Sequence, residues 1–245
     1  MTKLGIRLMA ALLLLGPGIA WAQTPAAPAK QKAQPVFVTD AAAERIENLD
    51  HLKAELKQYH DCTCACGCYA RDLDRQAGLG IAFLRRRMAH PRSGEKAAMV
   101  LDIDETSLSN YQEMAGADFA YNETVFNAWV DSAQAPAIAG TLRLYKEAQR
   151  LGVKIFFITG RPETQRAVTE RNLRAQGFDG WEHMDLRPAP HGPGSASLFK
   201  IAMRKQIVAD GYTLVLNVGD QWSDLRGAPE AQFNVKYPDP FYYLP

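Results

Sequence analysis

Three short apolar runs of the sequence, at 97–101, 153–158 and 213–218, each lead directly into polar residues that can do chemistry. The residues that follow the runs are Asp102 and Asp104, Thr159 and Gly160, and Asp220 and Asp224. In open parallel sheets, ligands bind beyond the carboxyl ends of the strands. If the three runs are parallel strands, these polar residues are expected in one site at that edge of the sheet.

Four aspartates gathered in one site would repel one another unless a cation neutralises them. Their hard oxygen atoms suit Mg²⁺, and no pair of histidines in the sequence competes for the role of metal ligand. Mg²⁺ keeps coordination positions open for water and for a substrate phosphate. We therefore expect Mg²⁺ as the cofactor, and its presence favours phosphoryl chemistry.

The spacing of Asp102 and Asp104 separates two roles. Residues two apart at a strand end point to the same side. Asp102 can face a substrate as nucleophile, while Asp104 can protonate the leaving oxygen and then activate water. Thr159 and Lys200 can supply the fixed donors that a phosphoryl group needs. Caps and turns at strand ends also use Asp, Thr and Gly, but their ordered recurrence after three apolar runs favours a site.

The apolar runs have the length and composition of fully buried strands in a parallel sheet. Weaker strand candidates lie at 181–186 and 233–237, and helical patterns lie at 138–150, 163–176 and 197–210. Pro162 suits the first turn of the middle helix and Gly177 its end. Strands that alternate with helices of this length predict an α/β fold with right-handed crossovers. The segment 110–136 is longer than a simple connection, and we expect a small helical insert there, near the site.

Two helices are predicted in front of the sheet. Thr39 and Asp40 can cap a helix that runs towards Tyr59, and a second helix covers 69–88. We expect residues 38–95 to form an N-terminal helical extension with a cysteine-rich turn, and residues 96–245 to form the core.

The first 22 residues have the pattern of a cleavable secretory signal. Lys3 and Arg7 precede the apolar run 8–15, which is too short to span a bilayer comfortably. Small residues follow, and the residue directly after Ala22 is Gln23, so the expected cut site has no cysteine to accept a lipid anchor. A buried N-terminal helix is the alternative interpretation. We expect a periplasmic or secreted chain cut after Ala22, with residues 23–37 as a disordered linker.

The charge of the chain is nearly balanced once this signal is set aside. The signal holds two of the 28 basic residues and none of the 27 acidic ones, which leaves 26 basic against 27 acidic residues. This balance gives no support for binding to nucleic acid or to a membrane surface. We expect a small-molecule substrate, no stable membrane anchor and possible oligomer formation.

The cysteine-rich turn contains Cys62, Cys64, Cys66 and Cys68. In an exported protein, an even number of cysteines favours disulfides, here two local bridges. Metal binding with His60 alongside is the alternative, although the spacing is not a standard zinc pattern.

Several aromatic and histidine side chains lie near the expected site. The aromatic residues of the insert are Phe119, Tyr121, Phe126 and Trp129. They either stack on an aromatic leaving group or pack the insert onto the core, and packing is the commoner use. His183 and His191, near the third strand end, either touch the substrate or lie in solvated loops.

A family resemblance becomes visible when these segments are taken together. The segments that carry it are 100–106, 108–111, 152–162 with its Phe-Phe-Ile-Thr-Gly-Arg run, Lys200 with Arg204, 217–225 and the tail 237–245. Their types and order resemble the haloacid dehalogenase (HAD) superfamily. Within it they resemble subfamily IIIB acid phosphatases, which include plant vegetative storage proteins and bacterial class C acid phosphatases. The resemblance covers about 69 to the C-terminus with the motif order intact.

The resemblance implies a Rossmann-like core, a parallel sheet flanked by helices, without a large cap domain. It implies that Asp102 is the nucleophile, Asp104 the acid and base, and Thr159, Gly160 and Lys200 the phosphate-binding residues. It also implies a set of metal ligands. These are Asp102, the main-chain carbonyl of Asp104, Asp220, and Asp224 directly or through water.

The function expected from the sequence is Mg²⁺-dependent hydrolysis of phosphomonoesters outside the cytoplasm, with 5′-nucleotides as possible substrates. A storage or binding protein on a HAD phosphatase fold is one alternative, and phosphotransfer to an alcohol acceptor is another. We further expect the substrate phosphate and Asp102 to raise the pKa of Asp104, with the metal opposing that rise, so that a rise would give a mildly acidic optimum.

Overall fold

The computed structural model describes residues 47–64, 68–188 and 196–244. The signal and linker predicted for residues 1–37, and the predicted cap at Thr39 and Asp40, lie outside these ranges. No helix within them is long and apolar enough to cross a membrane.

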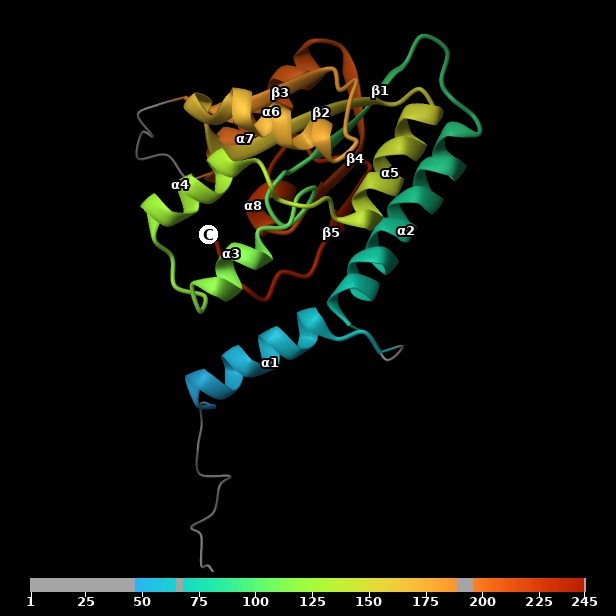
Figure 1. Cartoon of the computed structure of the whole chain (residues 1–245). Helices are drawn as coiled ribbons and strands as arrows, with labels where there is room; N and C mark the ends of the chain where they lie inside the picture. Colours follow the sequence, from blue (N-terminus) through green and yellow to red (C-terminus); the bar gives the residue numbers. More distant parts are fainter. Residues whose placement is uncertain (1–46, 65–67, 189–195, 245) are drawn as a thin grey trace, which may run out of the picture. The chain divides into compact units, whose positions relative to one another are not determined.

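Five parallel strands form one sheet in the order β3-β2-β1-β4-β5. Their bounds are β1 Lys96–Leu101, β2 Lys154–Pro162, β3 His183–Arg187, β4 Tyr212–Gly219 and β5 Phe233–Lys236. All five strands were predicted from the sequence, and the α/β class is confirmed. The first and fourth strands are neighbours, so the sheet reverses its winding direction beside β1 (Figure 1). In open parallel sheets, ligands bind outside the carboxyl ends of the strands at such a point.

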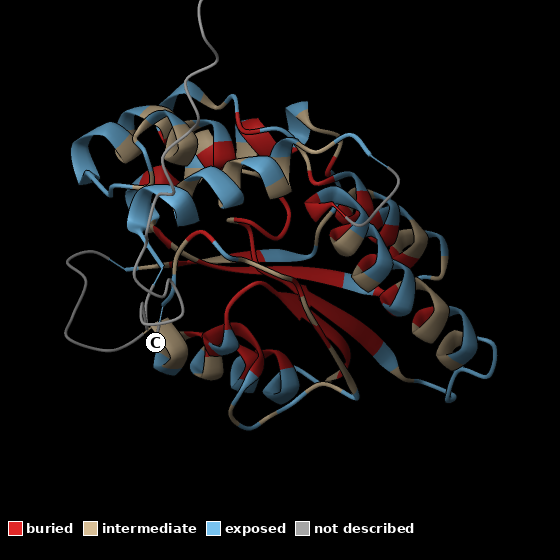
Figure 2. Cartoon of the chain, turned by 90° about the horizontal axis from the view of Figure 1, so that it is seen from below, coloured by how far each residue is buried: buried red, intermediate tan, exposed pale blue. Residues whose placement is uncertain are grey.

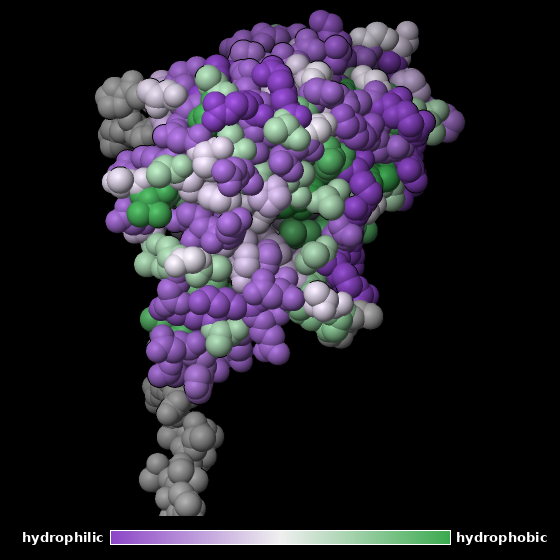
Figure 3. Space-filling view, viewed as in Figure 1, coloured by the Kyte–Doolittle hydropathy of each residue, from purple (hydrophilic) through white to green (hydrophobic). Residues whose placement is uncertain are grey.

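Helices cover both faces of the sheet, as Figure 2 shows around the buried strands. On one face, α2 (Tyr69–Met88) packs on α5 (Ala139–Arg150) and on β4 and β5, and α6 (Arg166–Ala175) contributes Leu173. On the other face, α7 (Ala196–Ala209) packs through Ile207 against Val100 and Phe156. The visible surface in Figure 3 is mostly hydrophilic, with hydrophobic residues in small groups.

Two helical boundaries differ from the sequence expectation. The first helix, α1 (Leu49–Asp61), begins after Asn48, whose side chain accepts hydrogen bonds from the backbone of Asp50 and His51. The expectation of one continuous helix from Asp40 was therefore wrong, because a local cap begins it later.

Pro162 differs as well. It ends β2, where it pairs with Arg187, instead of opening the following helix. A single 3-10 turn, η2 (Glu163–Gln165), separates it from α6. Gly177 does follow α6 with a positive φ of 91°, a conformation that favours glycine at a helix end.

The insert between β1 and α5 is helical, as predicted. It holds α3 (Tyr111–Gly116) and α4 (Glu123–Ser132). Phe119 stacks on Phe241 of the C-terminal tail at 5.9 Å, and Trp129 packs against the core, whereas Tyr121 is 76% exposed. Packing thus accounts for Phe119 and Trp129 but not for Tyr121.

The cysteine-rich turn joins α1 to α2. The Sγ atoms of Cys62 and Cys64 are 2.8 Å apart, and those of Cys64 and Cys68 are 3.7 Å apart. Cys66 lies outside the described residues. Cys68 is a free thiol that donates to the Cys64 carbonyl at 3.2 Å, so the expectation of two local bridges does not hold at Cys68. Neither of these sulfur–sulfur separations is a covalent bond, which would need about 2.05 Å. Cys64 is nevertheless disulfide-bonded, so the expectation of disulfides in this turn is confirmed at Cys64 and not at Cys68.

Candidate active site

The sequence-predicted carboxylates meet beyond the carboxyl ends of β1 and β4. Asp102 follows β1, Asp220 follows β4, and Asp224 lies in the one-turn helix α8 (Trp222–Leu225). One carboxylate oxygen from each of the three lies within 4.8 Å of the others. All three side chains are buried, with exposed fractions of 6% or less.

The fold holds Asp224 in place through its local sequence. Its Oδ2 accepts a hydrogen bond from the Gln221 backbone at 2.8 Å, which forms a capping box at the start of α8. Gly219 permits this approach, because a Cβ at that position would lie 2.3 Å from the Asp224 side chain. Arg204, fully buried on α7, donates to the main-chain carbonyls of Asp224, Arg226 and Gly227.

Lys200 provides the positive charge at the centre of this cluster. Its Nζ donates to Asp102 Oδ1 at 2.6 Å and also to Asp224 Oδ1. Burial lowers the pKa of Lys200, but the two carboxylates outweigh burial and raise it above its usual value. Lys200 is therefore a permanently charged donor between the expected nucleophile and the expected metal ligands.

One lysine does not balance the cluster. Burial raises the pKa of Asp102 well above its usual range. The positive charge of Lys200 lowers this pKa, but the negative charges of Asp224 and Asp220 oppose that effect. Burial, followed by the charges of Asp224 and Asp239, raises the pKa of Asp220 to about 8. A divalent cation would relieve this repulsion and keep the carboxylates ionised near neutral pH. The donor set consists of carboxylate oxygens, one from each residue within 4.8 Å of the others, and such oxygen ligands fit Mg²⁺.

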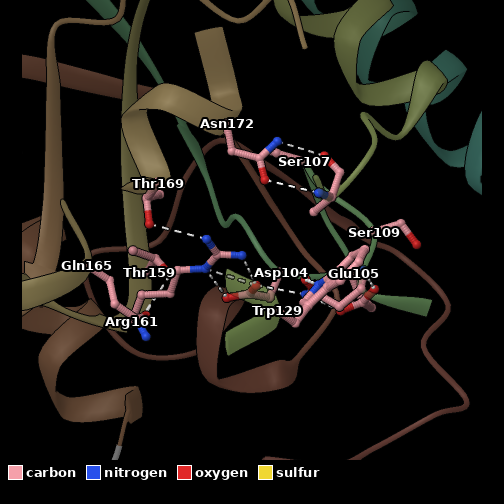
Figure 4. A network of polar contacts seen from close by, with 12 residues as sticks. Asp104, Glu105, Ser107, Ser109, Trp129, Thr159, Arg161, Gln165, Thr169 and Asn172 are labelled. Atoms are coloured by element: carbon pink, nitrogen blue, oxygen red, sulfur yellow. Dashed lines mark hydrogen bonds and ion pairs between the residues drawn. The ribbon is translucent and has the colours of Figure 1, made fainter. Parts of the chain in front are cut away.

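Asp104 is bound by Arg161, which lies near the end of β2. The guanidinium and the carboxylate point toward each other in Figure 4, with Arg161 Nη2 2.7 Å from Asp104 Oδ1. Burial raises the pKa of Asp104, but the charge and hydrogen bonds of Arg161 and a bond from Asn110 outweigh it, so the pKa is lowered. The sequence expectation concerned the pKa of Asp104 with a substrate phosphate bound, and it did not include Arg161, which lowers this pKa in the protein by itself.

Thr159 and Gly160, the predicted phosphate-binding residues, lie at the end of β2 beside β1. Thr159 is fully buried and its Oγ1 accepts from the Arg161 backbone at 3.1 Å. Gly160 has open space where a Cβ would point. The hydroxyl hydrogen of Thr159 and the space at Gly160 are compatible with a phosphoryl group there.

Several site residues were not found from the sequence. Thr106 Oγ1 donates to Asp220 Oδ1 at 2.9 Å, and Gln221 Nε2 donates to Asp220 Oδ2 at 2.8 Å and to Asp239 Oδ2 at 2.7 Å. Tyr242 of the tail donates to Asp220 Oδ2 at 3.4 Å. Thr106 and Gln221 lie within the recognised segments 100–106 and 217–225 and could have been found there, whereas the return of the tail to Asp220 has no local sequence signal.

A hollow of about 470 Å³ opens beside Asp220. Its wall includes Trp222, which is 45% exposed, and Tyr243, which is 71% exposed. Lys236 lies 5.7 Å from the centre of the Trp222 ring. The two predicted histidine positions differ in status: His183 is exposed and pairs with Asp185 at 3.3 Å, and His191 lies outside the described residues.

Comparison with known proteins agrees with the expected family. A family model described as HAD superfamily, subfamily IIIB (acid phosphatase), matches residues 25–245. Acid phosphatase 1 of Solanum lycopersicum is 38% identical over 148 residues, 59% of this chain and 58% of that protein. The stem 28 kDa glycoprotein of Glycine max is 36% identical over 182 residues, 72% of this chain and 64% of that protein.

Vegetative storage protein 1 of Arabidopsis thaliana is 34% identical over 152 residues, 60% of this chain and 55% of that protein. The matches thus span between 55% and 64% of the length of these three relatives. Among solved structures, the class C acid phosphatase from Bacillus anthracis superposes with a TM-score of 0.65 at 23% identity. That superposition covers 80% of this chain and 86% of the other, and it shows a shared fold.

Proposed function

We propose that this chain, which belongs to subfamily IIIB of the HAD superfamily, the acid phosphatases, hydrolyses phosphomonoesters with Mg²⁺ as cofactor. The observation that carries the proposal is the position of Lys200 Nζ, 2.6 Å from Asp102 Oδ1 and bonded also to Asp224, inside a cluster of three buried aspartates. This arrangement pairs a nucleophilic carboxylate with a fixed cationic donor for the phosphoryl oxygens.

In the proposed reaction, Asp102 attacks phosphorus and forms an aspartyl-phosphate, while the leaving oxygen takes a proton from Asp104. Asp104 then accepts a proton from the water that attacks phosphorus, and the Asp102–phosphorus bond breaks. Lys200 and Thr159 hold the phosphoryl oxygens throughout. Asp102, Asp220 and the Asp104 main-chain carbonyl would hold Mg²⁺, with Asp224 bound directly or through water. When bound, the cation supplies charge neutralisation at the phosphoryl group.

For the substrate, we propose phosphomonoesters that carry an aromatic group, either as an aryl leaving group or as the base of a 5′-nucleotide. The exposed Trp222 and Tyr243 in the wall of the hollow beside Asp220 support this, because aromatic rings favour stacking on flat groups. The N-terminal pattern around Lys3, Arg7 and Ala22 supports export from the cytoplasm with removal of the first 22 residues.

Release of inorganic phosphate from a panel of esters tests this function. The panel contains 5′-nucleotides, an alkyl phosphate and nitrophenyl phosphate, and each is measured after chelation and dialysis, then with Mg²⁺ added. We expect little release in chelator and restored release with Mg²⁺. A folded chain that releases no phosphate from any ester would favour the storage or binding alternative. Full release in excess chelator would remove the metal from the mechanism.

A further inference from the structure

The two oxygens of the Asp104 carboxylate have different surroundings. Oδ1 accepts from Arg161 Nη2 at 2.7 Å, from Asn110 Nδ2 at 2.8 Å and from Arg161 Nε at 3.1 Å. Oδ2 accepts one long bond, from Arg161 Nε at 3.2 Å, among the described residues. A carboxylate oxygen has two lone pairs, so the three donors occupy Oδ1 and leave Oδ2 with capacity for another partner.

Arg161 is itself fixed. Its side chain is 3% exposed, and its Nη1 donates to Thr169 of α6 at 3.2 Å, on the opposite side of the guanidinium from Asp104 (Figure 4). A planar fork held at both ends gives the carboxylate one orientation instead of a range of orientations.

Asn110 completes this arrangement from the insert side. Its Nδ2 donates to Asp104 Oδ1 at 2.8 Å and to Glu105 Oε2 at 2.9 Å, while its Oδ1 accepts from Trp129 Nε1 at 2.9 Å. Rotating the amide by half a turn would face its oxygen toward two carboxylates and its NH₂ group toward the indole N–H. The indole of Trp129, which can only donate, therefore determines the orientation of the amide together with the carboxylates of Asp104 and Glu105.

We propose that Asn110 and Arg161 are positioning residues that fix Asp104 with Oδ2 as the oxygen that exchanges a proton with the leaving group, and that Trp129 of α4 sets Asn110. The inference rests on the proposed phosphatase function. It connects the insert to proton transfer, because Trp129 of α4 contacts Asn110, and Asn110 contacts Asp104. Reacting groups must be held closely, and a shift of about 1 Å can cost about 10²-fold in rate.

Replacing Trp129 by Phe tests the inference with the ring retained and the Nε1 donor removed. We expect the single-turnover rate of leaving-group release to fall about 10-fold for an alkyl phosphate, which needs a proton on its leaving oxygen. For nitrophenyl phosphate, whose leaving group needs less protonation, we expect a fall of about 2-fold or less. KM should change little for both substrates, because Trp129 acts through Asn110. Asn110→Ala should repeat the pattern with a larger loss.

Asn127→Ala is the matched control. Asn127 also lies on α4 and accepts a hydrogen bond from Gln165 Nε2 of η2 at 2.9 Å, so its removal breaks a link between insert and core without touching the donors of Asp104. We expect equal, small changes for both substrates. Equal losses for both substrates in Trp129→Phe, or no loss for either, would overturn the inference while leaving the phosphatase function in place. A wild-type chain that releases no leaving group would overturn both.

Discussion

Asp102, Asp220 and Asp224 are buried carboxylates that share one cation, Lys200. Burial and neighbouring acidic groups raise the pKa values of Asp102 and Asp220. Keeping these carboxylates ionised therefore costs stability in the absence of a further cation. At residue scale, therefore, the geometry that would bind Mg²⁺ and phosphate is electrostatically unfavourable without a further cation.

Lys200→Met should lower both activity and stability. The substitution removes the donor to Asp102 and Asp224, and loss of one fixed donor at a developing charge costs about 10²–10³-fold in kcat. It also leaves buried carboxylates without their partner, which we expect to cost roughly 3 kcal/mol in the free energy of unfolding. Phosphate-release kinetics and urea unfolding in chelator measure the two effects.

Lys205→Met on the same helix is the control, because Lys205 is exposed. It should leave both quantities unchanged. Near-normal kcat in Lys200→Met would mean that another group binds the phosphoryl oxygens.

The positions of Asp102, Asp104, Thr159, Lys200, Asp220 and Asp224 at one edge of the sheet could be predicted because each follows a recognisable strand or begins a recognisable helix. The partners of Asp104 could not. Asn110 contacts Asp104, and Trp129 contacts Asn110, only through the fold of the insert, and no spacing in the sequence encodes these contacts. The lowered pKa of Asp104 could not be predicted either, because it depends on the contacts with Arg161 and Asn110.

At the scale of elements, the junction of β4 and α8 depends on the absence of a side chain at position 219. We expect Gly219→Ala to destabilise the protein by roughly 1–3 kcal/mol, because the added Cβ would lie 2.3 Å from Asp224. Displacing Asp224 should also raise the Mg²⁺ concentration needed for half-maximal activity. Gly78→Ala is the control, because that exposed position in α2 has open space for a Cβ. An unchanged Mg²⁺ requirement in Gly219→Ala would argue against Asp224 in the metal site.

The pairing of α2 with α5 gives a pH-dependent contribution to stability. Glu147 on α5 accepts from Arg150 on its own helix at 2.6 Å and from Arg85 on α2 at 2.8 Å. These hydrogen bonds lower the pKa of Glu147 from 4.5 to about 2. A lowered folded-state pKa stabilises the protein above the unfolded value, and the contribution is lost as the pH falls from about 4.5 through about 2.

We therefore expect Glu147→Gln to lower the free energy of unfolding by up to about 1 kcal/mol at pH 7 and by less at pH 3. The effect is small because both arginines are largely exposed. Urea unfolding at the two pH values measures this difference. Arg85→Gln should retain part of the effect and Arg150→Gln another part. A cost that grows as the pH falls would contradict the account.

The apolar runs at 97–101 and 213–218 predicted strands because a short apolar run is the main sequence feature of a buried parallel strand. Boundaries set by single contacts were less accessible. The side chain of Asn48 begins α1 well after Asp40, and pairing of Pro162 with Arg187 lengthens β2. At the start of α1 and at the end of β2, the local sequence allows two conformations, and the rest of the fold determines which one forms.

At the scale of the whole molecule, one strand order brings together groups that are more than 100 residues apart in the sequence. The neighbours β1 and β4 place Asp102 beside Asp220, and the tail returns through Tyr242 to the same carboxylate. In a storage protein these residues would have a structural role alone. In a phosphatase they would also form and break down a covalent intermediate. Phosphotransfer to an alcohol would use the same intermediate, and comparing phosphate release with ester formation in added alcohol separates it from hydrolysis.

The covalent intermediate on Asp102 is the central claim, and rapid acid quench with a substrate carrying a radiolabelled phosphoryl group tests it most directly. We predict protein-bound label within the first turnover that is released by hydroxylamine, as expected for an acyl phosphate. Asp102→Asn should fold, carry no label and release no phosphate, whereas Asp104→Asn should hold the label longer because water attack loses its base. Label or near-normal turnover in Asp102→Asn would contradict the account.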